Sequence, residues 1–318
     1  MTSTEAVAGK PQTIFRTLEH ARIRDEPAAL VTLVGTTGSS ARSVGSHMAV
    51  LGANARLGSF SAGCVDEAVA AEARDCLAAG RPRLVRFGHG SPYIDIRLPC
   101  GGGMDLLFLP DLPASELGRT AALLESRAPV ALALDGSGRF EVAADRSSQS
   151  FDVGADTFLV RHVPTLRILV IGQGEECVAL MRLALAHGAE IELLSADDSL
   201  LSFASAAGIA SRRLVTPSSI PTLHADPWSA VVLLFHDHDW EAELLAAALA
   251  TPAFWIGAMG SRRTQEARRA ALAVRGLPQQ QIERIKGPIG LIPSARDPAT
   301  LALSALAEIV GAYQESAT

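Results

Sequence analysis

The chain has 318 residues, of which 48% are hydrophobic and only 5% aromatic, and its formal net charge at pH 7 is -6. These values exclude a disordered chain and are typical of an α/β protein of about two domains with aliphatic cores. They also argue against a nucleic-acid or anionic-membrane partner held by bulk electrostatics, because such binding needs clustered Lys and Arg.

The first half of the chain predicts a mixture of strands and helices. Its loop over residues 35–45 is rich in glycines and hydroxyls around one cation, Arg42, and is a candidate anion nest. We expect helices over residues 11–24, 65–79 and 114–126, and strands near residues 29–34, 46–51, 56–60, 83–87, 92–98, 104–109, 129–134 and 139–144.

From residue 166 strands and helices alternate, as in a parallel doubly wound sheet. The expected strands are 167–171, 191–194, 229–235 and 253–258, and the expected helices are 175–187, 239–250, 262–275 and 298–313, the last with Asp297 as N-cap. The fold class is therefore α/β. An N-terminal α+β domain with a mixed sheet over residues 1–155 precedes a Rossmann-like domain over residues 156–318.

Residues 1–10 lack an apolar run followed by a small-residue cleavage site, and no apolar run approaches the length of a membrane span. We therefore expect a cytoplasmic protein. In that reducing compartment the cysteines should be free thiols, since none has CxxC spacing. Cys76 and Cys177 lie within predicted helices and are expected in the core.

Two cysteines stand in glycine-rich turns that suggest chemistry. Cys64 follows Gly63 just before a helix, where unpaired amides lower a thiol pKa, although Asp66 and Glu67 should oppose this unless Arg42 comes close. Cys100 stands directly before three glycines. Glycine lets the backbone approach a bulky ligand. The alternative for each thiol is a small buried residue.

Three strand ends of the second half carry candidate ligand-binding residues. Gly172-x-Gly174 opens a helix after a strand, as in a phosphate site, but Ser195 stands where a dinucleotide site needs an acid, so a scaffold role stays open. His236-Asp237-His238 could recruit a metal or line the rim. Gly260-Ser261-Arg262-Arg263 places two arginines in a first helical turn, which favours a nearby anion.

Taken together, the motifs resemble the XdhC/CoxI proteins over nearly the whole chain. The resemblance rests on motifs that recur in the family's order: Gly38-Ser39-Ser40-Ala41-Arg42, Gly45, Gly58-Ser59, Gly63-Cys64-Val65-Asp66, Cys100-Gly101-Gly102, Gly172-x-Gly174, His236-Asp237-His238, Gly257-x-x-Gly260-Ser261-Arg262-Arg263 and Gly287-Pro288-Ile289-Gly290-Leu291. It implies a maturation factor for molybdenum hydroxylases. Such factors bind the molybdenum cofactor (molybdopterin), protect it while a cysteine desulfurase supports its sulfuration, and pass it to the apo-enzyme as dimers.

The resemblance also implies roles for particular residues. Cys64 is expected to contact molybdenum through the cofactor or to handle sulfur, with Cys100 as its companion, and Arg42, Arg262 and Arg263 are expected to contact phosphate. The other expected cofactor-binding residues are Gly38, Ser39, Ser40, Gly63, Gly101, Gly102, Gly172, Gly174, His236, Asp237, His238, Gly260 and Ser261. A nucleotide in the Rossmann domain is a further expected ligand.

Departures from the family's usual residues are conservative in the first half, at Ala41, Ala62 and Asp66. In the second half Glu175 and Ser195 replace the usual histidine and acid, which weakens the case for a nucleotide and is consistent with a divergent paralogue. The hypothesis is a chaperone rather than a turnover enzyme, for a client of the xanthine dehydrogenase, aldehyde oxidase or CO dehydrogenase type. The alternatives are an NAD(P)-dependent oxidoreductase using the Gly172 turn, and a non-catalytic adaptor for the client enzyme.

Overall fold

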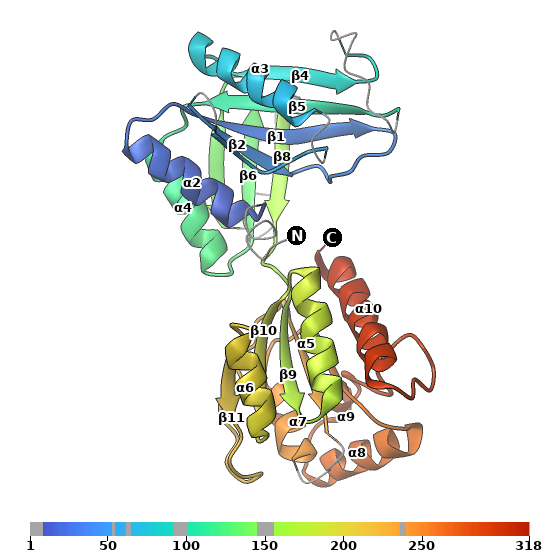
Figure 1. Cartoon of the computed structure of the whole chain (residues 1–318). Helices are drawn as coiled ribbons and strands as arrows, with labels where there is room; N and C mark the ends of the chain where they lie inside the picture. The colour runs from blue at the N-terminus through green and yellow to red at the C-terminus, as the bar shows by residue number, and fades with distance from the viewer. Residues whose placement is uncertain are drawn as a thin grey trace. The chain divides into compact units, whose positions relative to one another are not determined.

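The computed structural model describes residues 9–52, 55–61, 65–91, 101–144, 156–235 and 240–317. The chain divides into two compact units, Met1–Pro164 and Thr165–Thr318 (Figure 1). The strand β8 (Thr157–His162) pairs with β6 (Val130–Asp135), so it belongs to the first unit, whereas a boundary after residue 155 would place it in the second.

The first unit contains two sheets in which all described pairings are antiparallel, where a mixed sheet was expected. The larger sheet has the order β3-β2-β1-β5-β4, and the smaller has the order β7-β6-β8. The remaining elements are β1 (Ala28–Thr37), β2 (His47–Leu51), β3 (Ala55–Leu57), β4 (Arg83–Gly88), β5 (Gly103–Pro110), β7 (Phe140–Ala144), α2 (Pro11–Ile23), α3 (Asp66–Ala79) and α4 (Ala114–Glu125).

The larger sheet is buried on both faces because side chains of β1 alternate between two cores. Val31 and Leu33 pack in the core that includes α3, while Leu30 packs in the core that includes α2 and α4. Figure 1 shows α3 on one face of this sheet and α2 with α4 on the other. The sequence of β1 is accordingly a continuous apolar run rather than an alternating one.

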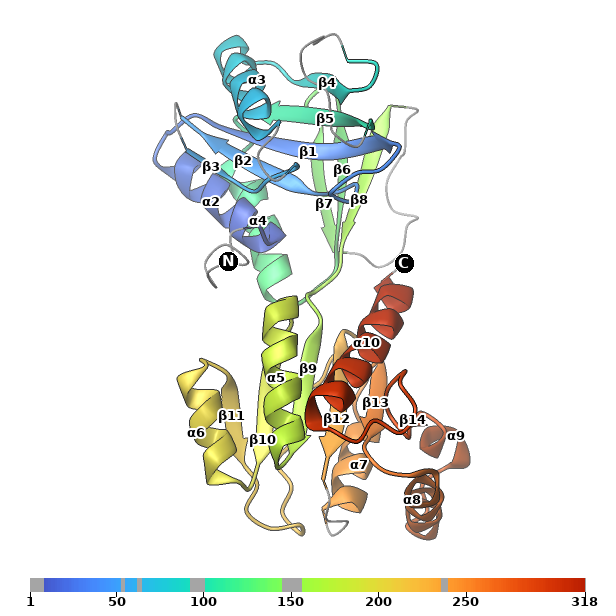
Figure 2. The same cartoon turned by 45° about the vertical axis from the view of Figure 1, so that its right-hand side comes forward.

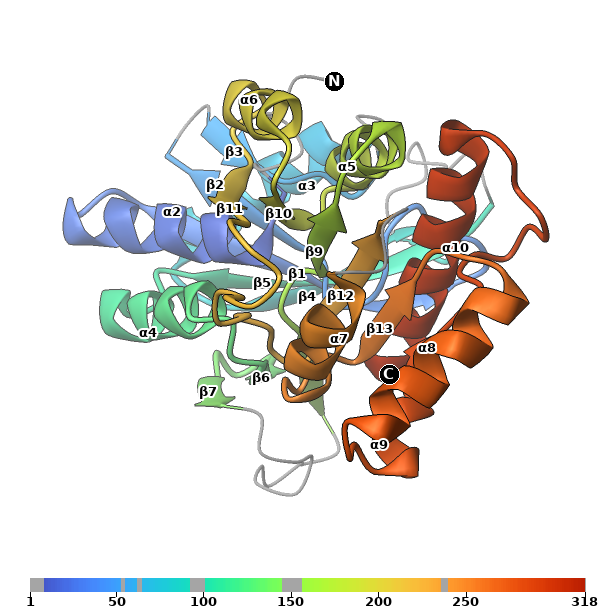
Figure 3. The ribbon, with the colours of Figure 1, turned by 90° about the horizontal axis from the view of Figure 1, so that it is seen from below.

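The second unit is a parallel six-stranded sheet with the order β11-β10-β9-β12-β13-β14. Helices cover both faces, with α5 and α10 side by side on one face and α7 and α8 on the other (Figures 2 and 3). The elements are β9 (Arg167–Gly172), α5 (Glu175–His187), β10 (Glu190–Ser195), α6 (Asp198–Ala206), β11 (Ala210–Arg213), β12 (Ser229–Leu234), α7 (Glu241–Leu249), β13 (Trp255–Ala258), α8 (Arg262–Val274), α9 (Gln279–Ile282), β14 (Ile285–Lys286) and α10 (Pro298–Ala317).

This strand order confirms the predicted doubly wound sheet. The order reverses between β9 and β12, so the segments after these strands diverge and leave a crevice at the carboxyl edge of the sheet. Ligands of such folds bind at that edge. The Gly172-x-Gly174 turn follows β9, and the Gly260 turn follows β13 at the same edge.

Local signals located most helix ends correctly. Gly80 and Gly188 have left-handed backbone angles after α3 and α5, as expected of terminating glycines. The Asp297 carboxylate accepts a hydrogen bond from the Thr300 amide at 2.8 Å, as an N-cap does. Strands β8, β11 and β14 and helices α6 and α9 were not predicted, and the expected strand over residues 92–98 lies outside the described residues.

Among the helices that the structure describes, none combines the length and the apolar character needed to cross a membrane.

Candidate functional site

In the first unit the loop after β1 lies against the glycine run that opens β5. A Cβ atom placed on Gly102 would lie 2.7 Å from the carbonyl oxygens of both Thr37 and Ser39, closer than a real side chain can come. Gly38 has a φ of 71°, a conformation that favours glycine. We name residues 37–39 and 101–103 the glycine cradle. Residues 37–40 and Gly101 are exposed, whereas Gly102 and Gly103 are buried, so the exposed side of the cradle consists of residues 37–39 and Gly101.

The same loop reaches the turn before α3 through Arg42, whose Nε donates a hydrogen bond to the Ser59 carbonyl at 3.1 Å. This turn is held by Asp66, whose carboxylate accepts from the Ser59 hydroxyl at 2.6 Å and from the Phe60 amide at 2.9 Å. Asp66 is only 2% exposed. Its buried charge is therefore compensated by donors of the turn.

This arrangement revises the electrostatics expected at the start of α3. Asp66 is engaged by the turn and Glu67 forms an ion pair with Arg56, so neither acid is an uncompensated anion at the start of α3. Arg42 does approach the turn. The positive end of the helix dipole is thus less opposed than the sequence suggested.

Cys64 and Cys100, together with Gly63, lie outside the described residues. The described neighbours of these cysteines belong to segments that the loop over residues 38–45 contacts, namely the Ser59 turn and the Gly102 run. The other two thiols are buried as predicted. Burial raises the pKa of Cys76 to about 11 and raises the pKa of Cys177 further, so both are protonated at neutral pH.

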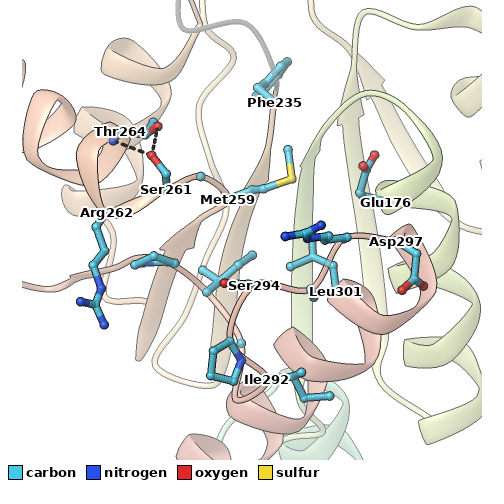
Figure 4. A pocket seen from close by; sticks show the side chains of 17 residues that line it. Glu176, Phe235, Met259, Ser261, Arg262, Thr264, Ile292, Ser294, Asp297 and Leu301 are labelled. Atoms are coloured by element: carbon cyan, nitrogen blue, oxygen red, sulfur yellow. Dashed lines mark hydrogen bonds between the residues drawn. The ribbon is translucent and has the colours of Figure 1, made fainter.

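The second unit has a cavity of about 840 Å³ at the carboxyl edge of its sheet (Figure 4). Figure 4 shows Glu176 and Asp297 on one side and Ser261 and Arg262 on the other. Gly260, Ser261 and Arg262 line this cavity, whereas Gly172, Gly174 and Arg263 are not among its described lining residues. The structure therefore gathers part of the predicted rim set around the α8 turn.

The Gly172-x-Gly174 turn is closed by hydrogen bonds and carboxylates. The Ser195 hydroxyl donates to the Gly172 carbonyl at 2.7 Å. A Cβ atom on Gly174 would lie 3.1 Å from Oε2 of Glu176. The pKa of Asp197 is lowered chiefly by the Ser199 hydroxyl and amide, and the Gly174 amide contributes as well. Two carboxylates thus border the place where a dinucleotide phosphate would sit.

The carboxylates disfavour an anion at this turn. At about 4 Å near a protein surface a carboxylate repels a phosphate by up to about 4 kcal/mol, whereas a helix N-terminus stabilises an anion by about 1 kcal/mol. The α8 turn lacks this obstacle. Ser261 caps the helix by accepting from the Thr264 amide at 3.1 Å, and the first turn of α8 holds no acidic residue.

Arg268, a buried residue that the sequence analysis did not identify, holds the α8 turn in place. Arg268 is 5% exposed and donates to the Met259 carbonyl at 2.9 Å and to Oε1 of Gln265 at 2.6 Å. It also binds both carboxylate oxygens of Glu241, at 3.1 and 2.7 Å. Glu241 begins α7 and Met259 directly follows β13, so one guanidinium on α8 connects α7 with the segment after β13. The sequence signal available was a basic residue on the apolar side of α8.

Within the described ranges, no three metal-binding side chains gather in one place. His236, Asp237 and His238 lie outside these ranges. Among the described residues, Gly38, Ser39, Gly101 and Gly102 of the predicted set lie in the glycine cradle of the first unit, and Gly260, Ser261 and Arg262 lie at the α8 turn of the second unit.

Two family models match the chain: the XdhC Rossmann domain over residues 168–309, and the XdhC and CoxI family over residues 21–88. The molybdenum cofactor insertion chaperone PaoD of Escherichia coli (strain K12) is 35% identical over 298 residues, which are 94% of this chain and 87% of PaoD. The uncharacterized protein YqeB of the same organism is 29% identical over 104 residues, 30% of this chain and 19% of YqeB.

A crystal structure described as a xanthine dehydrogenase from Bacillus halodurans superposes with a TM-score of 0.73. The match covers 95% of this chain and 96% of that chain at 20% sequence identity. At this identity the likeness shows the fold alone. It extends through both units.

Proposed function

Because the chain belongs to the XdhC and CoxI family, we propose that it is a chaperone that binds the molybdenum cofactor and delivers it to a molybdenum enzyme. The observation that carries this proposal is the match to PaoD, which is described as a molybdenum cofactor insertion chaperone. That match extends over both units of the chain, so it includes both sets of candidate residues. The cofactor is the cargo of this protein.

The glycine cradle fits such a cargo on chemical grounds. A pterin ring has donors and acceptors along its edge, and the cradle offers exposed backbone at Gly38 and Gly101, two residues that carry no Cβ atom. Arg42 beside the Ser59 turn suits a phosphate ester. Cys64 is our first choice for a soft sulfur ligand near molybdenum, and Cys100 is the second. The bound cofactor would supply the molybdenum chemistry, whereas this chain would bind and orient it.

In the second unit, Gly260, Ser261 and Arg262 form the end of the cavity best suited to a negatively charged part of a ligand. Arg263 and the residues His236, Asp237 and His238 stay proposed contacts at the same edge of the sheet. In this proposal Gly172 and Gly174 shape the turn after β9 and do not bind a phosphate, because the carboxylates of Glu176 and Asp197 border their turn.

The proposal also has parts that the family resemblance alone supports. The client is a hydroxylase of the xanthine dehydrogenase, aldehyde oxidase or CO dehydrogenase type. The chaperone holds the cofactor while a cysteine desulfurase supports installation of the terminal sulfido ligand. It acts in the cytoplasm as a homodimer.

Anaerobic capture of the cofactor by single-thiol variants tests the proposal. We expect Cys64→Ala to bind the cofactor about tenfold more weakly than the wild type, because loss of a ligand interaction of about 1.4 kcal/mol raises the dissociation constant tenfold, so at cofactor concentrations below that constant it should capture about a tenth as much. Molybdenum analysis and pterin fluorescence after oxidation measure the bound cofactor.

Cys76→Ala is the matched control, because it removes a buried thiol of the same unit that points into the core. It should capture the cofactor like the wild type. Equal capture by Cys64→Ala would remove the thiol assignment. A wild-type protein that binds the client enzyme but never carries a pterin would instead support the adaptor alternative.

A further inference from the structure

One guanidinium in the first unit spans three segments that border the glycine cradle. Nη1 of Arg86 lies 2.9 Å from both carboxylate oxygens of Asp105, and Nη2 donates to the Thr37 hydroxyl at 2.6 Å. Nε donates to the His89 carbonyl at 2.7 Å. Arg86 is on β4, Asp105 on the neighbouring strand β5, and Thr37 at the end of β1. A single side chain therefore cross-links two adjacent strands and the start of a loop.

Each partner of Arg86 belongs to the cradle or lies close to it in the chain. Thr37 is a cradle residue, and Asp105 lies two residues after Gly103. His89 links Arg86 to the cradle. Its carbonyl accepts from Arg86, and its amide donates to the Gly102 carbonyl at 2.9 Å. The contacts of Arg86 thus reach the cradle from β1, from β5 and from the turn after β4.

The guanidinium of Arg86 and the carboxylate of Asp105 lie close against glycines of β5 and β1. A Cβ atom on Gly103 would lie 2.8 Å from Nη2 of Arg86 and 2.9 Å from the Thr37 hydroxyl oxygen. A Cβ atom on Gly35 would lie 2.9 Å from Oδ2 of Asp105. Glycines at these positions let the guanidinium and its carboxylate lie directly on the strands. Movement of Arg86 would therefore change the separation of the two cradle segments.

Arginine suits this task better than lysine. Its planar guanidinium holds five donors in a fixed fork, so it can bind a carboxylate with one nitrogen while the other nitrogens bind a hydroxyl and a carbonyl. An ammonium group is a single point with rotatable donors. It can pair with Asp105 but cannot hold Thr37 and His89 at fixed positions as well.

We propose that Arg86, anchored by Asp105, is a positioning residue that sets the spacing of the glycine cradle and thereby the affinity of this protein for the pterin of its cargo. The inference rests on the proposed cofactor-binding function. Arg86 acts through Thr37, His89 and the cradle backbone, and it makes no contact with the cargo itself.

The same strand offers a matched control. Arg83, three residues before Arg86 on β4, forms an ion pair with Glu72 of α3, with 2.6 Å between Nη1 and Oε1. Both arginines are partly exposed and both pair with a carboxylate. Only Arg86 also binds segments of the cradle. Arg83→Lys and Arg86→Lys therefore make the same chemical change on the same strand.

The experiment measures cofactor capture and hydrogen exchange for both variants of the full chain under anaerobic conditions. We expect Arg86→Lys to raise the dissociation constant for molybdopterin about tenfold, the effect typical of removing a residue that orients a ligand group. Amide exchange should accelerate in peptides over residues 35–45 and 101–104. Arg83→Lys should leave the dissociation constant within about twofold and accelerate exchange over residues 66–79 instead.

A Thr37→Val variant sharpens the result, because it removes one of the bonds while keeping the charge pair between Arg86 and Asp105. It should raise the dissociation constant less than Arg86→Lys does. Unchanged affinity in Arg86→Lys, or equal losses in Arg83→Lys and Arg86→Lys, would overturn the inference.

If the wild type captures no pterin, the proposed function fails, and hydrogen exchange alone then decides the positioning role. Acceleration confined to the cradle in Arg86→Lys would support that role. Unchanged exchange there would overturn it.

Discussion

Each unit buries an ionisable pair, but one pair is neutral and the other is charged. In the first unit the Nε2 atoms of His47 and His162 lie 2.8 Å apart, and Nδ1 of His47 lies 2.9 Å from the Thr32 hydroxyl. Burial lowers the pKa of His162 to about 4 and lowers that of His47 well below its usual value. Both rings are therefore neutral. In the second unit Arg268 and Glu241 form an ion pair with side chains 2% and 6% exposed.

The two pairs predict different conditions under which each unit loses folding stability. A neutral histidine pair is satisfied by one proton between its nitrogens, so the first unit is sensitive to acid. Removing one member of a buried ion pair leaves the other charge uncompensated, so the second unit is sensitive to the loss of either partner. Three measurements test this difference between the units.

The largest effect is expected from Arg268→Met, which leaves Glu241 buried without its cation. We expect the free energy of unfolding of the second unit to fall by about 3–5 kcal/mol. Tryptophan fluorescence can follow this transition, because Trp228, Trp240 and Trp255 all belong to the second unit.

Arg269→Met is the matched control, since Arg269 is the next residue of α8 and is exposed. It should change stability by less than about 0.5 kcal/mol. The double variant Arg268→Met/Glu241→Leu should recover much of the loss, because it removes both charges. A loss below 1 kcal/mol for Arg268→Met, with 1 kcal/mol taken as roughly the value of one ordinary hydrogen bond, would contradict the role assigned to this pair.

The second effect is acid sensitivity confined to the first unit. Since the folded pKa of His162 is lowered to about 4, this stability is present above the unfolded pKa of 6.5 and is lost as pH falls from 6.5 towards 4. At about pH 5 the loss from His162 should be about 2 kcal/mol. Far-ultraviolet circular dichroism should show a lower unfolding midpoint, while the tryptophan transition of the second unit changes little.

A His162→Gln variant keeps an amide near His47 but cannot be protonated. Its first unit should lose less stability between pH 7.5 and pH 5 than the wild type. If acid shifted both transitions equally, the histidine pair would not be the cause.

The smallest effect concerns the carboxyl edge of the sheet in the second unit, where the carboxylates of Glu176 and Asp197 border the Gly172 turn. Wild type should give no thermal shift with NAD or NADP, because Glu176 and Asp197 border the Gly172 turn. Glu176→Gln should raise the affinity for inorganic pyrophosphate about tenfold, which corresponds to about 1.4 kcal/mol. Isothermal titration would measure it.

Glu175→Gln provides the control, since Glu175 is the exposed neighbour in the same helical turn. It should change pyrophosphate affinity far less. A nicotinamide-dependent shift in the wild type that disappears in Gly174→Val would restore the oxidoreductase alternative.

Much of the fold could be read locally from the chain. The apolar run of β1, the glycines after α3 and α5, and the caps Ser261 and Asp297 are signals of a few neighbouring residues, and each marked the expected element. Strand β11 was missed because it is mostly exposed and has no apolar run. The ordered set of motifs was also sufficient to indicate the family, which the match to PaoD confirms.

Side-chain contacts between residues far apart in the chain appear only in the tertiary structure. Arg86 meets Thr37 across 49 residues of chain, and His47 meets His162 across 115. No local pattern marks these residues, because each partner is supplied by a different strand. The amino-acid sequence specifies which residues are small, acidic or basic at each turn. The hydrogen bonds of the Asp66 carboxylate to its own turn, the carboxylates beside the Gly172 turn, and the approach of Gly102 to the Thr37 and Ser39 carbonyls depend on the folded chain, which sets these distances.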